Sequence, residues 1–412
     1  MMGDHQVQAV DAEYASDKTA EHLLQLIQAL VNEVHPQRPS SAVITLDSTF
    51  EKDLGLDSLA RVELISRVEK RFRLALPERS FAEAETARDL LRAVLGAAGP
   101  RTTLSAAEIQ PLELGEASAA PTESQTLLEV LDWHLAHHPE RPLIQIYQDD
   151  NLGKVITYQQ LAAGAKEVAA GLQHSGIQAA EPVAIMLPSG TDYFFSFFGV
   201  LMAGGIPVPV YPPARPSQLE DHMRRHVRIL ANCRATTLIT VTEAKHVAQL
   251  LKSLVPGLRH IVSVAELSAA GAVAPLPVLS SSDIAFLQYT SGSTGNPKGV
   301  VLTHANLLAN IRAMGQVVQA GPDDVFVSWL PLYHDMGLIG GMLAPLYSSG
   351  RAVFMSPASF LQRPLRWLQA ISDYRGCVSG APSFAYDLCV EKTTPEQRAA
   401  LDLSCWKVAF CG

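Results

Sequence analysis

The sequence contains little cysteine, has no excess of positive charge and lacks a secretory signal. Its 412 residues include five cysteines without a C-x-x-C pair, so neither a disulfide framework nor a zinc knuckle is indicated, and a reducing cytoplasm is expected. The formal charge is −9, from 32 Lys+Arg against 41 Asp+Glu, which excludes a broad basic surface for nucleic acid. The first ten residues lack the basic and apolar regions of a secretory signal. We therefore expect a cytoplasmic protein with no nucleic-acid partner.

Long hydrophobic runs are also missing. The longest uncharged stretch, Tyr193 to Ala214, is interrupted by Gly204, Gly205 and four prolines. Proline removes a backbone donor and ends helices, so this stretch predicts a buried helix followed by a buried strand. No transmembrane segment is expected.

The composition divides the chain into parts. Hydrophobic residues make up 48% of the sequence, and a chain of this length typically folds into two to four domains, at roughly 100–200 residues each. Residues 96–125 are rich in Ala, Gly, Pro, Ser, Thr and Glu without periodicity, as in linkers. We expect a disordered N-terminus over 1–19, an acidic domain over 20–95, this linker, and a larger domain over 126–412.

The two domains differ in periodicity. Apolar residues recur every three or four positions over 22–34 and 59–72, and a shorter helix is expected over 87–96. After the linker, helical segments alternate with short apolar runs, as in 158–176 followed by 182–188. This alternation is typical of an α/β domain with a largely parallel sheet. The predicted fold is a multidomain chain, an all-α helix bundle followed by an α/β domain.

A serine opens the second expected helix. The residues G-L-D-S-L at 55–59 lead directly into the amphipathic segment, and Ser58 could act there as a helix cap. In its acidic, helical context this motif resembles acyl and peptidyl carrier proteins. The resemblance implies that Ser58 carries 4′-phosphopantetheine, attached by a phosphopantetheinyl transferase, and the helix dipole would favour that phosphate. Glu63 and Glu69 either dock a basic partner or are solvated helix charges.

A glycine- and hydroxyl-rich segment lies between two apolar runs. Residues 290–299 read T-S-G-S-T-G-N-P-K-G, and glycine backbone, hydroxyls and a lysine are the groups that hold phosphate. A Walker A loop is excluded because Lys298 is followed by Gly299 instead of Ser or Thr.

Together with the preceding tyrosine, this loop resembles the signature loop of the adenylate-forming superfamily. The resemblance implies that the loop holds the phosphates of ATP while a carboxylate attacks the α-phosphate, and it implies Mg²⁺, although no metal-ligand set is visible in the sequence. The matching residues are Thr290, Ser291, Gly292, Ser293, Thr294, Gly295 and Lys298.

A second block, L-P-L-Y-H-D-M-G-L at 330–338, narrows the choice within the superfamily. With V-P-V-Y-P-P at 208–213 and L-T-H-A-N-L-L-A-N at 302–310, it resembles the fatty acyl-AMP ligases. The resemblance implies that His334 lies where the acyl carboxylate meets ATP, with catalytic roles for His334 and Lys298. Two other interpretations stay open, namely a histidine bonded within a loop and an Asp335 that pairs with an amino-acid substrate.

The resemblance implies activation of a fatty acid with ATP and transfer to a phosphopantetheine arm, feeding downstream synthase or acyltransferase domains. An acyl-CoA synthetase and a non-catalytic carrier scaffold are the alternatives. The last residues, 408–412, resemble the start of the family's adenine-binding segment. The family's later elements are absent from the sequence, so we expect the α/β domain to be incomplete and the 412-residue chain by itself to adenylate poorly.

Three histidines could suggest a metal site. His134, His137 and His138 lie at helical spacing, but a convincing set of four ligands is lacking. We expect a solvated helix face there and no metal site.

Overall fold

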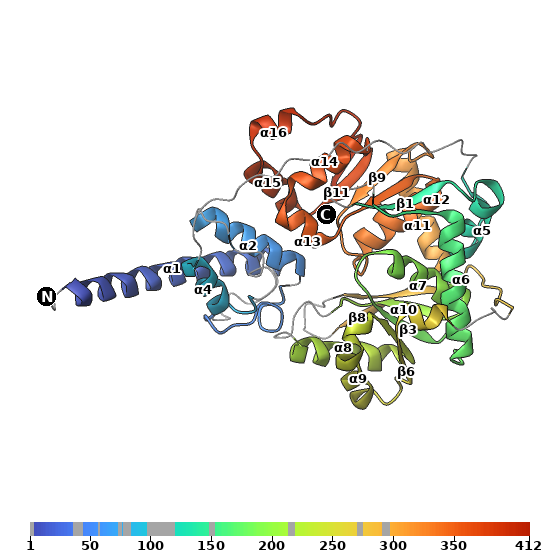
Figure 1. The fold of residues 1–412 in the computed structure, drawn as a ribbon, viewed down its shortest axis with the longest axis horizontal. Helices are drawn as coiled ribbons and strands as arrows, with labels where there is room; N and C mark the ends of the chain where they lie inside the picture. Colours follow the sequence, from blue (N-terminus) through green and yellow to red (C-terminus); the bar gives the residue numbers. More distant parts are fainter. Residues whose placement is uncertain are drawn as a thin grey trace. The chain divides into compact units, whose positions relative to one another are not determined.

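The structure is a computed structural model in which two compact units can be described, each by itself (Figure 1). The first unit holds the described residues up to Gly96 and the short stretch 219–222, and the second holds those from Ala120 to Pro212, Met223 to Thr290 and Pro297 to Gly412. Most of the expected linker lies outside the described residues, which are 4–35, 44–56, 58–72, 76, 84–96, 120–147, 153–212, 219–269, 275–290 and 297–412.

The first unit is helical, as the apolar spacing predicts. Its helices are α1 (Asp4–Val34), α2 (Ser58–Phe72) and α4 (Ala87–Gly96). Each helix turns one apolar face inward, and burial of these faces is the main force that holds such a bundle together. The shared core includes Leu23, Ile27, Leu30, Leu64, Val68, Leu90 and Val94.

The N-terminal segment that was expected to be disordered includes the start of α1, which begins at Asp4. The segment from Asp4 to Val34 contains no glycine or proline and is rich in Ala, Gln, Glu and Leu, which favour helix. The helix ends just before His35, which precedes a proline in the sequence and therefore disfavours helical geometry.

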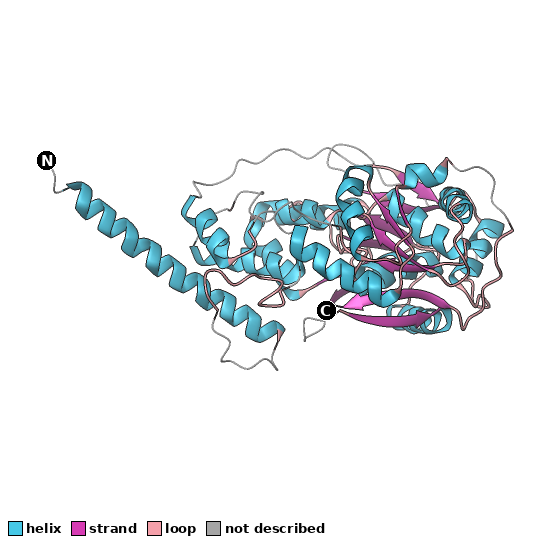
Figure 2. Ribbon diagram, turned by 90° about the horizontal axis from the view of Figure 1, so that it is seen from below, coloured by secondary structure: helices cyan, strands magenta, loops and turns pink. Residues whose placement is uncertain are grey.

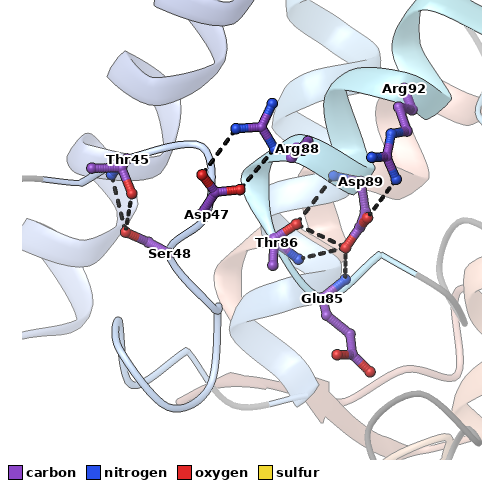
Figure 3. A network of polar contacts seen from close by, with 8 residues as sticks. All are labelled: Thr45, Asp47, Ser48, Glu85, Thr86, Arg88, Asp89 and Arg92. Carbon is purple, nitrogen blue, oxygen red and sulfur yellow. Dashed lines mark hydrogen bonds and ion pairs between the residues drawn. The ribbon is translucent and has the colours of Figure 1, made fainter.

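Hydrogen bonds and an ion pair stabilise the N-terminus of α4 (Figure 3). The Asp89 Oδ2 atom accepts hydrogen bonds from the backbone N–H of Glu85 and Thr86 and from the Thr86 hydroxyl. Arg88 donates to both carboxylate oxygens of Asp47, at 2.7 and 2.9 Å. These bonds satisfy free donors at the helix N-terminus and tie the helix to the segment that precedes α2.

The second unit is an α/β structure, which confirms the predicted fold class. Its described strands form sheets in the orders β12-β11-β9-β10-β1-β2 and β4-β3-β5-β6, plus the hairpin β7-β8. Pairing is parallel except between β1 and β2 and within the hairpin. The strands are β1 (Pro142–Ile146), β2 (Val155–Thr157), β3 (Pro182–Met186), β4 (Ile206–Pro209), β5 (Thr237–Thr240), β6 (His260–Val262), β7 (Ile284–Thr290), β8 (Lys298–Thr303), β9 (Val325–Ser328), β10 (Arg351–Phe354), β11 (Val378–Ala381) and β12 (Val408–Cys411).

Helices lie around these strands, as Figure 2 shows in cyan and magenta. A π-helix, η2 (Met336–Leu343), continues directly into α12 (Ala344–Ser348). The other helices are α5 (Leu127–His137), α6 (Tyr158–His174), α7 (Thr191–Met202), α8 (Leu219–Cys233), η1 (Thr242–Ala244), α9 (Lys245–Leu254), α10 (Val264–Ser268), α11 (His304–Val318), α13 (Pro357–Gln362), α14 (Leu365–Asp373), α15 (Ser383–Lys392) and α16 (Pro395–Ala399).

The long uncharged stretch folds as its composition predicts. It forms the buried helix α7 and then the buried strand β4. The helices α6 and α7 approach closely, because a Cβ atom added at Gly199 would lie 2.6 Å from the Cβ of Val168. Among the residues that the structure describes, no helix has the length and apolar content needed to span a membrane.

The expectation of a solvated helix face is wrong for His134 and His138, whereas His137 is exposed. His134 is fully buried and His138 is 9% exposed. The His134 Nε2–H donates to the Leu346 carbonyl at 2.6 Å, so its Nδ1 accepts from His138 Nε2 at 2.7 Å. The helix packs this face against α6 and α12, and His134 stacks on Tyr158 at 4.1 Å. The described residues contain no cluster of three metal-ligating side chains.

Candidate active site

The hairpin β7–β8 brings the two ends of the glycine-rich loop together. Thr290, the last residue of β7, is paired directly with Lys298, the first residue of β8. The residues between them that were expected to hold phosphate, Ser291, Gly292, Ser293, Thr294 and Gly295, lie outside the described residues. The structure therefore shows the base of the predicted phosphate loop and the two side chains at its ends.

Both of those side chains are exposed. In the described part of the chain, neither the Thr290 hydroxyl nor the Lys298 ammonium has a hydrogen-bond partner of its own. A hydroxyl donor and a cation side by side at the mouth of a hairpin suit an anionic oxygen ligand. This donor set fits a phosphate group.

The second predicted motif forms a tight turn after β9. The backbone N–H of His334 donates to the Pro331 carbonyl at 3.1 Å, and the His334 carbonyl accepts from Leu338 N at 2.8 Å. The turn is so close that a Cβ atom added at Gly337 would lie 2.2 Å from the Pro331 oxygen. Glycine at this position is therefore a steric requirement.

The imidazole of His334 is half-buried at this turn. Its ring lies 5.2 Å from the ring of Tyr333, and it has no polar partner among the described residues. The neighbouring Asp335 is exposed and its Oδ1 accepts from Met336 N at 2.7 Å, which caps the π-helix. An imidazole without a protein partner is available to a substrate oxygen.

A hydrogen bond joins the two motifs. Gln288 lies on β7 two residues before the loop, and its Nε2 donates to the Tyr333 carbonyl at 2.7 Å. The preceding carbonyl, that of Leu332, accepts from the Tyr193 hydroxyl at 2.7 Å. Burial raises the pKa of Tyr193, so this hydroxyl stays a donor. Neither side chain was among the predicted site residues, although a glutamine within an apolar strand was a visible signal.

A small hollow lies beside the His334 turn. Its polar groups are occupied, since Ser379 donates to the Val327 carbonyl at 2.6 Å and accepts from Trp367 Nε1 at 2.8 Å. At Gly340 an added Cβ atom would meet nothing within 4 Å. The hollow is small and has polar as well as apolar surface, and it is lined by Phe326, Val327, Ser328, Leu330, Met336, Gly340, Gly341, Val378, Ser379, Gly380 and Phe410.

In the first unit, Ser58 is the first residue of α2. Glu69 is only 6% exposed and its Oε1 accepts from Leu76 N at 2.6 Å, so it is neither a docking residue nor a solvated charge. Glu63 pairs with Arg67, which also contacts Glu33 at 2.5 Å. The sequence hypothesis of an acidic docking pair is therefore wrong for Glu69, whose carboxylate stabilises the unit internally.

Comparisons with known proteins match both units. Residues 23–94 match the family described as phosphopantetheine attachment site. The chain is 35% identical over 295 residues to a medium-chain-fatty-acid–[acyl-carrier-protein] ligase from Moorena producens, covering 70% of this chain and 50% of the relative. It is 37% identical over 263 residues to a long-chain-fatty-acid–AMP ligase from Mycobacterium marinum, covering 62% and 44%.

The solved structures agree with these relatives. A fatty acid AMP ligase from Legionella pneumophila superposes with a TM-score of 0.64 at 36% identity, covering 70% of this chain and 50% of that one. The chain thus spans about half the length of the relatives it matches. Residues 131–412, more than half of the chain, match the family described as AMP-binding enzyme. The chain therefore belongs to the AMP-binding enzyme family.

Proposed function

We propose that the protein activates a fatty acid with ATP as an acyl adenylate and passes the acyl group to a 4′-phosphopantetheine arm on Ser58. The observation that carries this proposal is the hydrogen bond from Gln288 to the Tyr333 carbonyl. It links the strand that enters the phosphate loop to the residue before His334, so that the two motifs belong to one site. The proposal includes a carrier domain over 20–95, a linker over 96–125 and an adenylate-forming domain over 126–412.

In the proposed first step, a carboxylate oxygen of the fatty acid bonds to the α-phosphorus of ATP and pyrophosphate leaves. The Lys298 ammonium neutralises phosphate charge and the Thr290 hydroxyl donates to a phosphate oxygen, which stabilises the charge of the transition state. His334 donates to the carboxylate and orients it for attack. Mg²⁺, when bound to the phosphates, supplies further charge neutralisation.

The second step moves the acyl group from AMP to the carrier. The thiol of the arm attacks the acyl carbonyl carbon, so that a thioester bond forms, the bond from this carbon to the phosphate oxygen breaks with AMP as the leaving group, and the thiol proton passes to solvent. Tethering the carrier to the ligase raises the effective concentration of the acceptor. The proposed partners are a phosphopantetheinyl transferase, which installs the arm, and downstream synthase or acyltransferase domains, which consume the acyl group. The similar ligase from Moorena producens is named for an acyl-carrier-protein acceptor, which supports a carrier as the acceptor of the acyl group.

The test uses the complete gene product, made with a phosphopantetheinyl transferase and given ATP, Mg²⁺ and a panel of fatty acids. Intact-protein mass is measured with and without free CoA for wild type, Ser58→Ala and the control Ser48→Ala from the same unit. We expect wild type and Ser48→Ala to carry both the arm and the acyl group, with or without CoA. Ser58→Ala should carry neither.

Two results contradict the proposal. Acyl-CoA in solution with an unacylated carrier would identify a CoA synthetase instead. An arm on Ser58 without any pyrophosphate release, for every fatty acid, would identify a carrier whose second unit does not activate acids.

A further inference from the structure

We propose that Gln288 is a positioning residue, whose side-chain amide holds the His334 turn in register with the phosphate loop. This inference rests on the proposed function, since it names the group that aligns the two halves of that site. Gln288 touches neither proposed substrate and acts through the backbone of Tyr333.

The placement of Gln288 is unusual for a buried strand residue. It is 6% exposed and pairs with Val300 across the hairpin. Because side chains alternate along a strand, Gln288 shares a face with Phe286, which is fully buried, and with Thr290 at the end of the hairpin. An apolar residue is the ordinary occupant of such a position. The amide instead connects the core face of β7 to a turn that lies 45 residues further along the chain.

The turn is held on its other side as well. The Tyr193 hydroxyl, at the start of α7, donates to the Leu332 carbonyl at 2.7 Å, and the Ser189 hydroxyl accepts from Leu332 N at 3.4 Å. Tyr193 is fully buried, so water does not compete for this bond. Two consecutive carbonyls before His334 are thus anchored to two different elements, α7 and β7.

This double anchoring matters for in-line attack on a phosphate. The carboxylate is oriented by His334 and the phosphates are held by the loop after Thr290, so the distance between these groups decides whether the reacting atoms meet. A misplacement of about 1 Å costs about a hundredfold in rate. Of the described contacts, the bond from Gln288 to Tyr333 is the one that directly joins the loop-bearing hairpin to the turn.

The test compares two matched substitutions in the complete gene product. Gln288→Met keeps the side-chain length and removes the donor. The control, Gln145→Met, makes the same change at a fully buried glutamine of β1 whose Nε2 donates to the Tyr374 hydroxyl at 3.2 Å, away from the site. Acyl-adenylate formation is followed by pyrophosphate release, with kcat and KM determined separately for ATP and fatty acid.

We expect Gln288→Met to lower kcat about ten- to a hundredfold, because alignment is lost, and to change both KM values less than about threefold. Gln145→Met should retain the wild-type kcat, although its melting temperature should shift by about as much as that of Gln288→Met. Tyr193→Phe, which removes the second anchor, should lower kcat in the same direction. Equal kcat values for the two glutamine variants, or a rise in KM that accounts for the whole loss, would overturn the assignment.

A second readout does not depend on activity. Hydrogen exchange at the His334 and Leu338 amides, which belong to the turn, should be faster in Gln288→Met than in Gln145→Met. If wild type releases no pyrophosphate, the proposed function fails, and this exchange measurement alone then decides the positioning role. Identical exchange in the two variants would refute it.

Discussion

Two buried histidines should make the stability of the second unit depend on pH. His134 and His304 are both fully buried. Burial lowers the pKa of His134 to about 3, assisted by the nearby charges of His138, Arg141 and His137. Burial lowers the pKa of His304 to about 4, against the opposing effect of Asp283 and Glu129. His304 accepts from the backbone N–H of Leu127 through its Nδ1 at 3.2 Å, which requires a neutral ring.

The direction follows from proton binding. In the unfolded chain an ordinary histidine has a pKa near 6.5, so below that pH the unfolded state binds protons that the folded state does not. The stabilisation is therefore complete above about pH 6.5 and is lost as the pH falls. Between pH 7 and pH 5 each histidine costs about 2 kcal/mol, and the two together cost about 4 kcal/mol.

This loss is large compared with the typical stability of a domain, about 5–15 kcal/mol. The measurement is urea unfolding at several pH values between 8 and 5, followed by a signal from the second unit. Wild type is compared with His134→Gln, His304→Gln and the double variant, with His174→Gln at an exposed position as the control. Each buried substitution should reduce the slope of the unfolding free energy against pH, by an amount that grows as the pH falls and approaches about one proton near pH 5.

The contribution of the other ionisable groups is common to all the proteins and cancels in the difference. The double variant should therefore lose about 4 kcal/mol less than wild type between pH 7 and pH 5. Parallel stability curves for wild type and double variant would show that these two rings are protonated in the folded state, and the reasoning from burial would be refuted.

Two further predictions concern single positions. Gly337→Ala places a Cβ atom 2.2 Å from the Pro331 oxygen and should destabilise the second unit by about 1–3 kcal/mol. The control, Gly340→Ala in the same π-helix, adds a Cβ atom that meets nothing within 4 Å and should be neutral or slightly stabilising. Similar melting temperatures for the two variants would contradict this prediction. Glu69→Met removes the acceptor of Leu76 N and should cost the first unit about 1–3 kcal/mol of unfolding free energy, measured by chemical denaturation, with an unchanged midpoint as the contrary result.

The elements of the fold were largely predictable because each follows from a local pattern. The helix α6 begins where Thr157 and Gln160 form a capping box, and β3 and β5 are short apolar runs between polar segments. The loop and the His334 turn were predictable as motifs, since their residue types are adjacent in the sequence. Local rules of this kind need no knowledge of which distant segments meet.

Burial at single positions was not predictable, because it depends on tertiary packing. His134 and His138 have a spacing that also occurs on solvated helix faces, and only the packing against α12 distinguishes the two cases. Glu69 looks like any helix carboxylate until the backbone of Leu76 is placed beside it. In each of these cases a polar side chain forms a hydrogen bond to a backbone group of another segment, and the sequence does not show which segment that is.

The Gln288 contact shows why such pairs escape sequence reasoning. Its partner is a main-chain carbonyl, and every residue type at position 333 would offer that acceptor. The residue type at position 333 therefore carries no information about the bond, and the sequence shows only the donor, Gln288. Gln288 stands out because it is a polar residue within the apolar strand that leads into the predicted phosphate loop. Polar residues at buried positions next to a recognised motif are for this reason the places where a positioning role is best sought.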